Sequence, residues 1–167
     1  MNFEDIFICT TDTVTGIGGP VNENTLKCIY YLKNRPISKK IIILVGSIEQ
    51  ARAFKEWNNE ADDFAAKYWP GAYSIIVNGQ GFRMPNNSQL CQFLLKNGPM
   101  YVTSANISGQ DPIDISEANK YFPLVKNVYD FGRGNNKASF IYNIDEKKMD
   151  KITIKIIFIN KAKSTTS

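Results

Sequence analysis

Short apolar runs separated by polar turns predict a series of β-strands along this chain. The run at residues 41–45 is unbroken and aliphatic, which is typical of a strand that is covered on both faces. The strands expected from such runs are residues 6–9, 41–45, 73–77, 82–84, 100–102, 128–131, 139–144 and 152–159.

Apolar residues at helical spacing predict helices between several of these strands. Ser47 and Gln50 form a capping-box pattern that opens one helix, and Asp114 with Glu117 opens a short one that ends before Pro123. The expected helices are residues 25–33, 47–57, 61–68, 88–97 and the short segment after residue 114.

The order of these elements favours a single domain. Strands and helices alternate early and strands cluster late, which predicts an α/β domain around a mixed sheet over residues 1–159. Residues 160–167 are expected to form a polar C-terminal tail. The glycine-rich GIGGP at residues 16–20 lacks the spacing of a P-loop or a dinucleotide fingerprint, so we expect a tight turn there.

The composition is that of a globular protein, with 43% hydrophobic and 22% charged residues in a chain of 167. The absence of histidine excludes a Ser-His-Asp triad, a Cys-His dyad and a histidine general base. Three widely spaced cysteines are expected to be buried thiols, not a metal or redox site. The net charge of +4 is compatible with a nucleotide or RNA partner but does not require one.

The sequence also bears on location. The N-terminal segment is too acidic and too polar for a signal peptide, and no apolar run is long enough to cross a membrane. We therefore expect a cytoplasmic protein without a membrane partner.

Three polar segments carry candidate binding chemistry. KNRPISKK at residues 33–40 places four cations within eight residues, where they could surround a triphosphate or simply face solvent. Arg83, in FRMPNN, lies in a predicted strand and needs an anionic partner, either internal or from a ligand. TSANISG at residues 103–109 offers hydroxyl, amide and backbone N–H groups to an anion or a ribose, although a plain turn could use the same residues.

In their order and spacing these motifs resemble YrdC-type threonylcarbamoyl-AMP synthases. The resemblance rests on TTDTVTGIG (10–18), KNRPISKK (33–40), YWPGAYS (68–74), FRMPNN (82–87), TSANISG (103–109) and Ser139. It implies an α/β, YrdC-like fold with a twisted, mixed open sheet and a large, concave, positively charged cavity. The chain is identified as a short, divergent member, in which the usual N-terminal helix is expected to be missing or replaced and a late arginine has no counterpart.

The resemblance implies two groups of site residues. It assigns no catalytic base and no metal ligand from the protein, and Asp12 is the nearest acidic candidate, either as a base or as a residue that orients its loop. Val102 would contribute only a backbone carbonyl. The residues implied for ATP are Lys33, Arg35, Lys39, Ser104 and Asn106, and those for threonine are Thr13, Arg83, Val102 and Ser139.

The activity implied is that of an L-threonylcarbamoyladenylate synthase, a nucleotidyltransferase. L-threonine, bicarbonate or CO2, and ATP with Mg2+ would give threonylcarbamoyl-AMP and pyrophosphate. Partner proteins would then transfer the threonylcarbamoyl group to tRNA, with which this chain could be in contact. The alternative is a non-catalytic YrdC-like module that binds RNA or tRNA.

Overall fold

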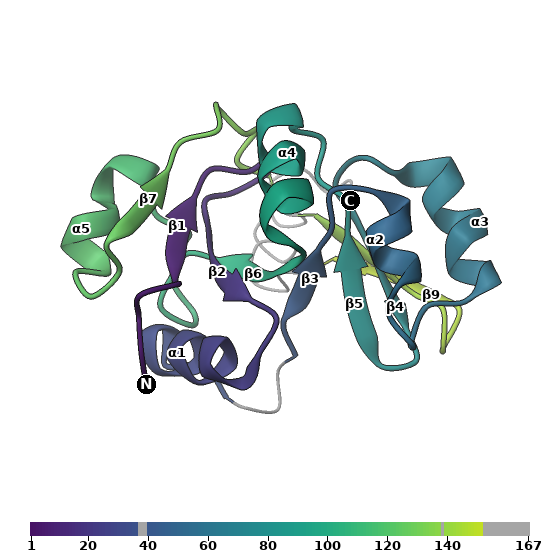
Figure 1. Cartoon of the computed structure of the whole chain (residues 1–167), viewed down its shortest axis with the longest axis horizontal. Helices are drawn as coiled ribbons and strands as arrows, with labels where there is room; N and C mark the ends of the chain where they lie inside the picture. Colours follow the sequence, from purple (N-terminus) through teal and green to yellow (C-terminus); the bar gives the residue numbers. More distant parts are fainter. Residues whose placement is uncertain (37–39, 138, 152–167) are drawn as a thin grey trace, which may run out of the picture.

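A computed structural model describes residues 1–36, 40–137 and 139–151. Within them the protein forms one nine-stranded mixed sheet in the order β7-β1-β2-β6-β3-β5-β4-β8-β9 (Figure 1), which confirms the expected fold class. The strands are β1 (Phe7–Cys9), β2 (Gly16–Pro20), β3 (Ile42–Leu44), β4 (Tyr73–Val77), β5 (Gln80–Arg83), β6 (Met100–Ser104), β7 (Asn127–Tyr129), β8 (Phe140–Asn143) and β9 (Lys148–Lys151).

Parallel and antiparallel pairs alternate irregularly across the sheet. The pairs β1–β7, β3–β5 and β4–β8 are parallel, and the other neighbouring pairs are antiparallel. The inner strand β6 lies between β2 and β3, with Val102 opposite Gly18 on one side and Ile42 on the other. The polar residues at the end of β6 therefore lie near the middle of the sheet.

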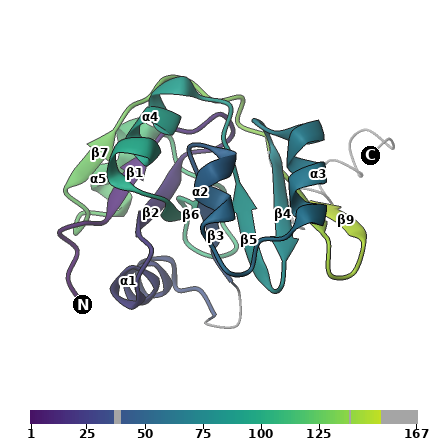
Figure 2. The same ribbon diagram turned by 45° about the vertical axis from the view of Figure 1, so that its right-hand side comes forward.

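The helices are distributed along the length of the sheet. Figures 1 and 2 show α5 at the end near β7 and α3 at the end near β4. None of the helices in the described residues has the length and apolar character needed to cross a membrane. The helices are α1 (Glu23–Lys33), α2 (Ile48–Arg52), α3 (Asn59–Tyr68), α4 (Ser88–Asn97), the 3-10 turn η1 (Ile115–Glu117) and α5 (Ala118–Tyr121).

Buried apolar side chains join these helices to the sheet in three clusters. One cluster packs Ala51, Ala61 and Ala65 of α2 and α3 against strands β3, β4 and β5. A second joins β1 and β2 to α1 and α5, and a third packs Leu90 and Leu94 of α4 against β1, β3 and β6. Burial of this apolar surface is the main force that holds the layers together.

GIGGP was expected to be a turn, and this prediction is wrong, since Gly16–Pro20 form strand β2. The glycines are needed because the neighbouring strand approaches closely. A Cβ on Gly18 would lie 2.8 Å from Cγ2 of Val102 and would also collide with the carbonyl oxygen of Tyr101.

The helix expected from residue 47 to about 57 is shorter than predicted. Ser47 does cap α2, accepting a hydrogen bond from the backbone N–H of Gln50, but the helix ends at Arg52. In a capping box the side chain of Gln50 would accept from the N–H of the cap residue, Ser47. Here it accepts from the N–H of Gly46, one residue earlier. Beyond the helix, Phe54 and Trp57 turn inward to pack on the core, a tertiary contact that local sequence does not encode.

Most other expected elements are confirmed with shifts of one or two residues. The strand predicted at residues 73–77 and the helix at 88–97 have the predicted bounds, and β6 continues two residues beyond its prediction to Ser104. Cys9 and Cys28 are buried as expected, whereas Cys91 is only partly buried. The strand predicted at 152–159 and the tail at 160–167 lie outside the described residues.

Candidate functional site

A cavity of about 770 Å3 is lined by residues of β2, β3, β4, β5, β6 and β8 and by residues of the loops after β1, α1, β4, β6 and β8. This volume is in the range of pockets that enclose small-molecule ligands. Eight of the nine site residues inferred from the sequence line it, and the ninth, Lys39, lies outside the described residues. The eight are Thr13, Lys33, Arg35, Arg83, Val102, Ser104, Asn106 and Ser139.

Lys33 is the last residue of α1 and is almost fully buried, with 1% of its surface exposed. Its Nζ donates to Oδ1 of Asn106 at 3.1 Å, to Oγ of Ser104 at 3.3 Å and to the carbonyl oxygen of Ser104. Its own carbonyl accepts from Ser108 N–H at 2.8 Å. The end of α1 and the loop after β6 are therefore joined through both the side chain and the backbone of Lys33.

Asn106 is held in a fixed orientation by its own loop. Its Nδ2 donates to the carbonyl oxygens of Ile107 at 2.9 Å and of Gln110 at 2.8 Å. This leaves Oδ1 to accept from Lys33 and from the hydroxyl of Ser104. Neutral oxygen atoms of Ser104 and Asn106 are therefore among the hydrogen-bond partners of the buried Lys33 side chain.

Arg35 lies two residues past the end of α1 and reaches across the cavity wall to β6. Its Nη1 donates to Oγ1 of Thr103 at 3.4 Å, and its Nη2 donates to the carbonyl oxygen of Lys40 at 2.9 Å. Burial lowers the pKa of the Arg35 guanidinium, while nearby Tyr30 acts in the opposite direction. Arginine remains protonated at neutral pH in proteins, so Arg35 places a fixed positive charge on this side of the cavity.

Lys40 also lines the cavity, and the resemblance had not assigned it to the site. Its Nζ donates to the carbonyl oxygen of Gly79 at 2.9 Å, at the tip of the β4–β5 hairpin. The KNRPISKK motif contained the signal, because Lys40 is one of its four closely spaced cations.

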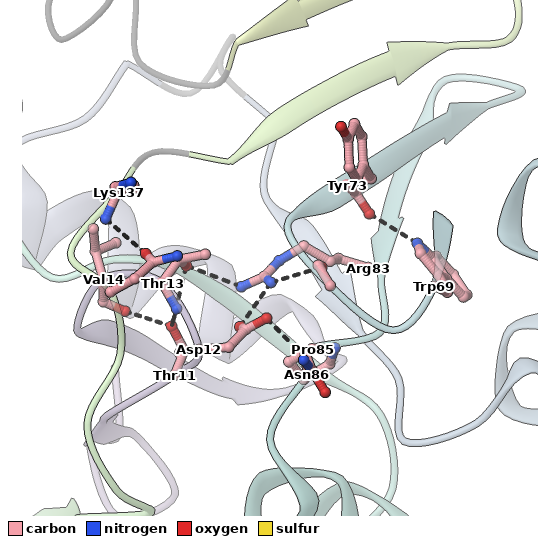
Figure 3. Close-up of polar contacts among 12 residues, drawn as sticks. Thr11, Asp12, Thr13, Val14, Trp69, Tyr73, Arg83, Pro85, Asn86 and Lys137 are labelled. Atoms are coloured by element: carbon pink, nitrogen blue, oxygen red, sulfur yellow. Dashed lines mark hydrogen bonds and ion pairs between the residues drawn. The ribbon is translucent and has the colours of Figure 1, made fainter. Parts of the chain in front are cut away.

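On the opposite side of the cavity, Arg83 forms a buried ion pair with Asp12. Its Nη1 lies 2.8 Å from Oδ1 of Asp12, and the two side chains are 7% and 11% exposed. Nη1 also donates to the carbonyl oxygen of Gly71 at 3.0 Å, and Nη2 donates to Oγ1 of Thr13 at 3.3 Å (Figure 3). The sequence left open whether the partner of Arg83 is internal or a ligand, and the structure supplies an internal carboxylate.

Hydrogen bonds in the loop that contains Thr13 determine whether the Thr13 hydroxyl donates or accepts a hydrogen bond. The hydroxyl of Thr11 donates its single hydrogen to the carbonyl oxygen of Val14 at 2.6 Å. In the 3.2 Å contact between the Thr11 and Thr13 hydroxyls, the donor must therefore be Thr13. Thr13 consequently presents only lone pairs to Arg83 and to the cavity, so a ligand group facing it must be a hydrogen-bond donor.

Val102 and Ser139 line the cavity from two different strands. Val102 lies in the middle of β6, and its side chain closes over Gly16 and Gly18 of β2. Ser139 is buried, with 6% of its surface exposed, and directly precedes β8. It lines the same cavity as Ile141 and Asn143, as the two-residue period of a strand requires.

The structure adds features that sequence reasoning missed. The backbone N–H groups of Asn135 and Asn136 donate to the carbonyl oxygens of Asp12 and Thr13 at 3.1 and 3.0 Å. Asp145 and Glu146 bring carboxylates to the cavity rim, and Asp145 accepts from the N–H groups of Asn78 and Gly79. The spacing along the chain gave no signal for these contacts, because they join segments about 70 and 120 residues apart.

The two sides of the cavity differ in chemistry. Lys33, Arg35 and the hydroxyl and amide groups of Ser104 and Asn106 form a polar, cationic side suited to phosphate oxygens. The other side combines an arginine that is already paired with a carboxylate and an acceptor hydroxyl at Thr13. This arrangement suits a smaller ligand that carries both an anionic group and a hydrogen-bond donor.

Comparison with known protein sequences identifies the family of the chain. The Sua5/YciO/YrdC family model, described as telomere recombination, matches residues 1–149. An uncharacterized protein of Mycoplasma pneumoniae is 39% identical over 150 residues, which is 85% of this chain and 31% of that protein. A threonylcarbamoyl-AMP synthase of Hydrogenovibrio crunogenus is 31% identical over 138 residues, which is 69% of this chain and 73% of that protein. The chain thus spans about a third of the mycoplasma relative.

Solved structures show the same fold. Pyrococcus abyssi Sua5 complexed with L-threonine matches with a TM-score of 0.77 at 25% identity, over 87% of this chain and 48% of that one. Escherichia coli YciO matches with a TM-score of 0.74 at 16% identity, over 89% of this chain and 84% of that one, which supports the fold alone. Since the family model covers nearly all described residues, the chain belongs to the Sua5/YciO/YrdC family.

Proposed function

We propose that this protein is an L-threonylcarbamoyladenylate synthase. It condenses L-threonine, bicarbonate or CO2, and ATP to threonylcarbamoyl-AMP and pyrophosphate. The relative from Hydrogenovibrio crunogenus carries the name of this activity, and the Sua5 of Pyrococcus abyssi was crystallised with L-threonine. Both support assignment of the chain to a transferase that acts in tRNA processing.

One observation carries the proposal more than any other. A single cavity is lined both by the cationic group around Lys33 and by the Arg83–Thr13 group. A synthase of this kind must hold a nucleotide triphosphate and an amino acid together, because the carboxylated amine of one attacks the α-phosphorus of the other. Holding two reactants in line supplies much of the rate enhancement in such a reaction.

The chemistry needs no histidine. The amine nitrogen of threonine attacks the carbon of CO2 and loses a proton, which gives a carbamate. A carbamate oxygen then attacks the α-phosphorus of ATP, the bond from that phosphorus to the bridging oxygen breaks, and pyrophosphate leaves with the electron pair. The protein's part is to place two anions side by side and to compensate their charge.

Each side of the cavity has a role in this scheme. Lys33 and Arg35, with Ser104 and Asn106, bind the triphosphate and stabilise the charge that develops on the leaving pyrophosphate. Arg83 binds the threonine carboxylate through the Nη2 and Nε donors that Asp12 does not use. Thr13 accepts a hydrogen bond from the N–H of the amine or carbamate, consistent with its acceptor-only hydroxyl. Ser139 and Val102 complete the amino-acid side.

Mg2+ is proposed to enter with ATP, held largely by phosphate oxygens, and it neutralises part of the triphosphate charge. Within residues 1–36, 40–137 and 139–151 no group of three or more acidic or cysteine side chains could hold a metal ion. Transfer of the threonylcarbamoyl group to tRNA is left to partner proteins in this proposal.

The proposal is tested by incubating purified protein with L-threonine, bicarbonate, ATP and Mg2+ and measuring pyrophosphate release. We expect release that depends on both threonine and bicarbonate. ATP turnover that ignores threonine would contradict the proposal. An absence of turnover with salt-sensitive tRNA binding would favour the RNA-binding alternative.

A further inference from the structure

Residues 134–136 lie directly on the loop that carries Thr13, although about 120 residues separate the two segments. The N–H groups of Asn135 and Asn136 donate to the carbonyl oxygens of Asp12 and Thr13 at 3.1 and 3.0 Å. Gly134 lies so close that a Cβ there would be 2.5 Å from the carbonyl oxygen of Thr11 and closer still to that of Thr13. Only a glycine lets this segment approach the loop to hydrogen-bonding distance.

The same loop is anchored from its other side by the carboxylate of Asp12. Oδ1 of Asp12 accepts from Arg83, and Oδ2 accepts from the backbone N–H of Asn86, both at 2.8 Å (Figure 3). One residue therefore ties the loop to the end of β5 and to the segment that leads into α4. The acceptor hydroxyl of Thr13 and the guanidinium of Arg83 are held 3.3 Å apart as a result.

We propose that Asp12 and Gly134 are positioning residues that fix Thr13 and Arg83 as one preformed receptor for the carboxylate and amine of an amino acid. Neither residue contacts the ligand. Gly134 lets residues 134–136 hold the backbone of the loop, and Asp12 holds the guanidinium. The inference rests on the proposed function for the identity of the ligand, L-threonine.

The geometry argues against the other role open to Asp12, that of a proton acceptor. Both of its carboxylate oxygens already accept hydrogen bonds, one of them from a buried cation. Positioning therefore accounts for both contacts, whereas general-base catalysis uses neither.

The experiment measures binding of L-threonine and of L-threonine amide, which lacks the carboxylate, by calorimetry without ATP. Gly134→Ala is compared with wild type and with Arg133→Ala, a matched control whose exposed side chain is one residue away. We expect Gly134→Ala to weaken threonine binding by roughly 10-fold to 100-fold, as displacement of a binding group by about 1 Å does. The preference of Gly134→Ala for threonine over the amide should fall, while its affinity for ATP stays close to that of wild type. Arg133→Ala should bind threonine and ATP with affinities close to those of wild type.

Other results would overturn the inference. These are unchanged threonine binding in Gly134→Ala, equal losses of threonine and ATP binding, or a wild type that does not distinguish threonine from its amide. If Gly134→Ala does not fold, Asp12→Asn is measured instead. The asparagine amide has only one acceptor oxygen, so its NH2 group must face either Arg83 or the N–H of Asn86, and one of these two hydrogen bonds is lost. Threonine binding should therefore weaken. Tighter or unchanged binding there would equally overturn the inference.

The two proposals fail separately. Wild-type protein that binds threonine but releases no pyrophosphate would contradict the proposed function and leave the positioning role standing. A Gly134→Ala enzyme that makes threonylcarbamoyl-AMP with the threonine dependence of wild type would contradict the positioning role and support the proposed function.

Discussion

Replacing Arg83 by alanine is expected to lower the free energy of unfolding, because it breaks the ion pair with Asp12. The Asp12 side chain is 11% exposed beside Arg83, and the change would leave its carboxylate with only the N–H of Asn86 as a hydrogen-bond partner among the side-chain contacts described. At an effective dielectric constant near 20, two unit charges about 4 Å apart attract by roughly 4 kcal/mol. Breaking one partner of a buried pair typically costs about 3–5 kcal/mol, and we expect Arg83→Ala to lose a comparable amount.

Urea unfolding with linear extrapolation measures this loss, and a double variant identifies its cause. Asp12→Ala combined with Arg83→Ala removes both charges, so it should recover about half or more of the stability that the single variant loses. A loss below about 1 kcal/mol in Arg83→Ala would show that solvent screens the pair and that the burial argument is wrong. A double variant no more stable than Arg83→Ala would show that the uncompensated carboxylate is not the cause.

The remaining predictions concern the nucleotide side and the sheet. Lys33→Met keeps roughly the length of the side chain and removes its charge. ATP binding, measured by calorimetry, should weaken at least about 10-fold, because one charge-assisted contact contributes roughly 1.5–3 kcal/mol. Threonine binding should change little. Equal losses for both ligands would contradict the separation of the two sides. Gly18→Ala should lower the free energy of unfolding by about 1–3 kcal/mol, because the new Cβ overlaps Val102, whereas a neutral result would show that β2 and β6 separate easily.

The sequence predicted the fold class and most helices and strands because local signals were strong. The helix Ser88–Asn97 begins after a capping asparagine and is followed directly by Gly98, and its bounds match the prediction. The failure at GIGGP has a definite physical reason. Glycines there serve the close approach of a neighbouring strand, and local sequence does not distinguish that need from the need of a turn.

The candidate site was predictable only as a set of residues. The motifs located Lys33, Ser104 and Asn106, and the structure joins them by hydrogen bonds across about 70 residues of chain. The pairing of Arg83 with Asp12 could not be chosen over a ligand partner from sequence, because it depends on how β5 and the loop after β1 meet. The contact of residues 134–136 with that loop is likewise a product of the tertiary fold.

The most direct test of the proposed synthase activity is the mass of the product formed with 13C-labelled bicarbonate, L-threonine, ATP and Mg2+. We predict threonylcarbamoyl-AMP with the label in its carbamoyl carbon, together with one pyrophosphate for each molecule formed. Release of ADP and phosphate, or of AMP without a labelled adduct, would contradict the proposed synthase activity.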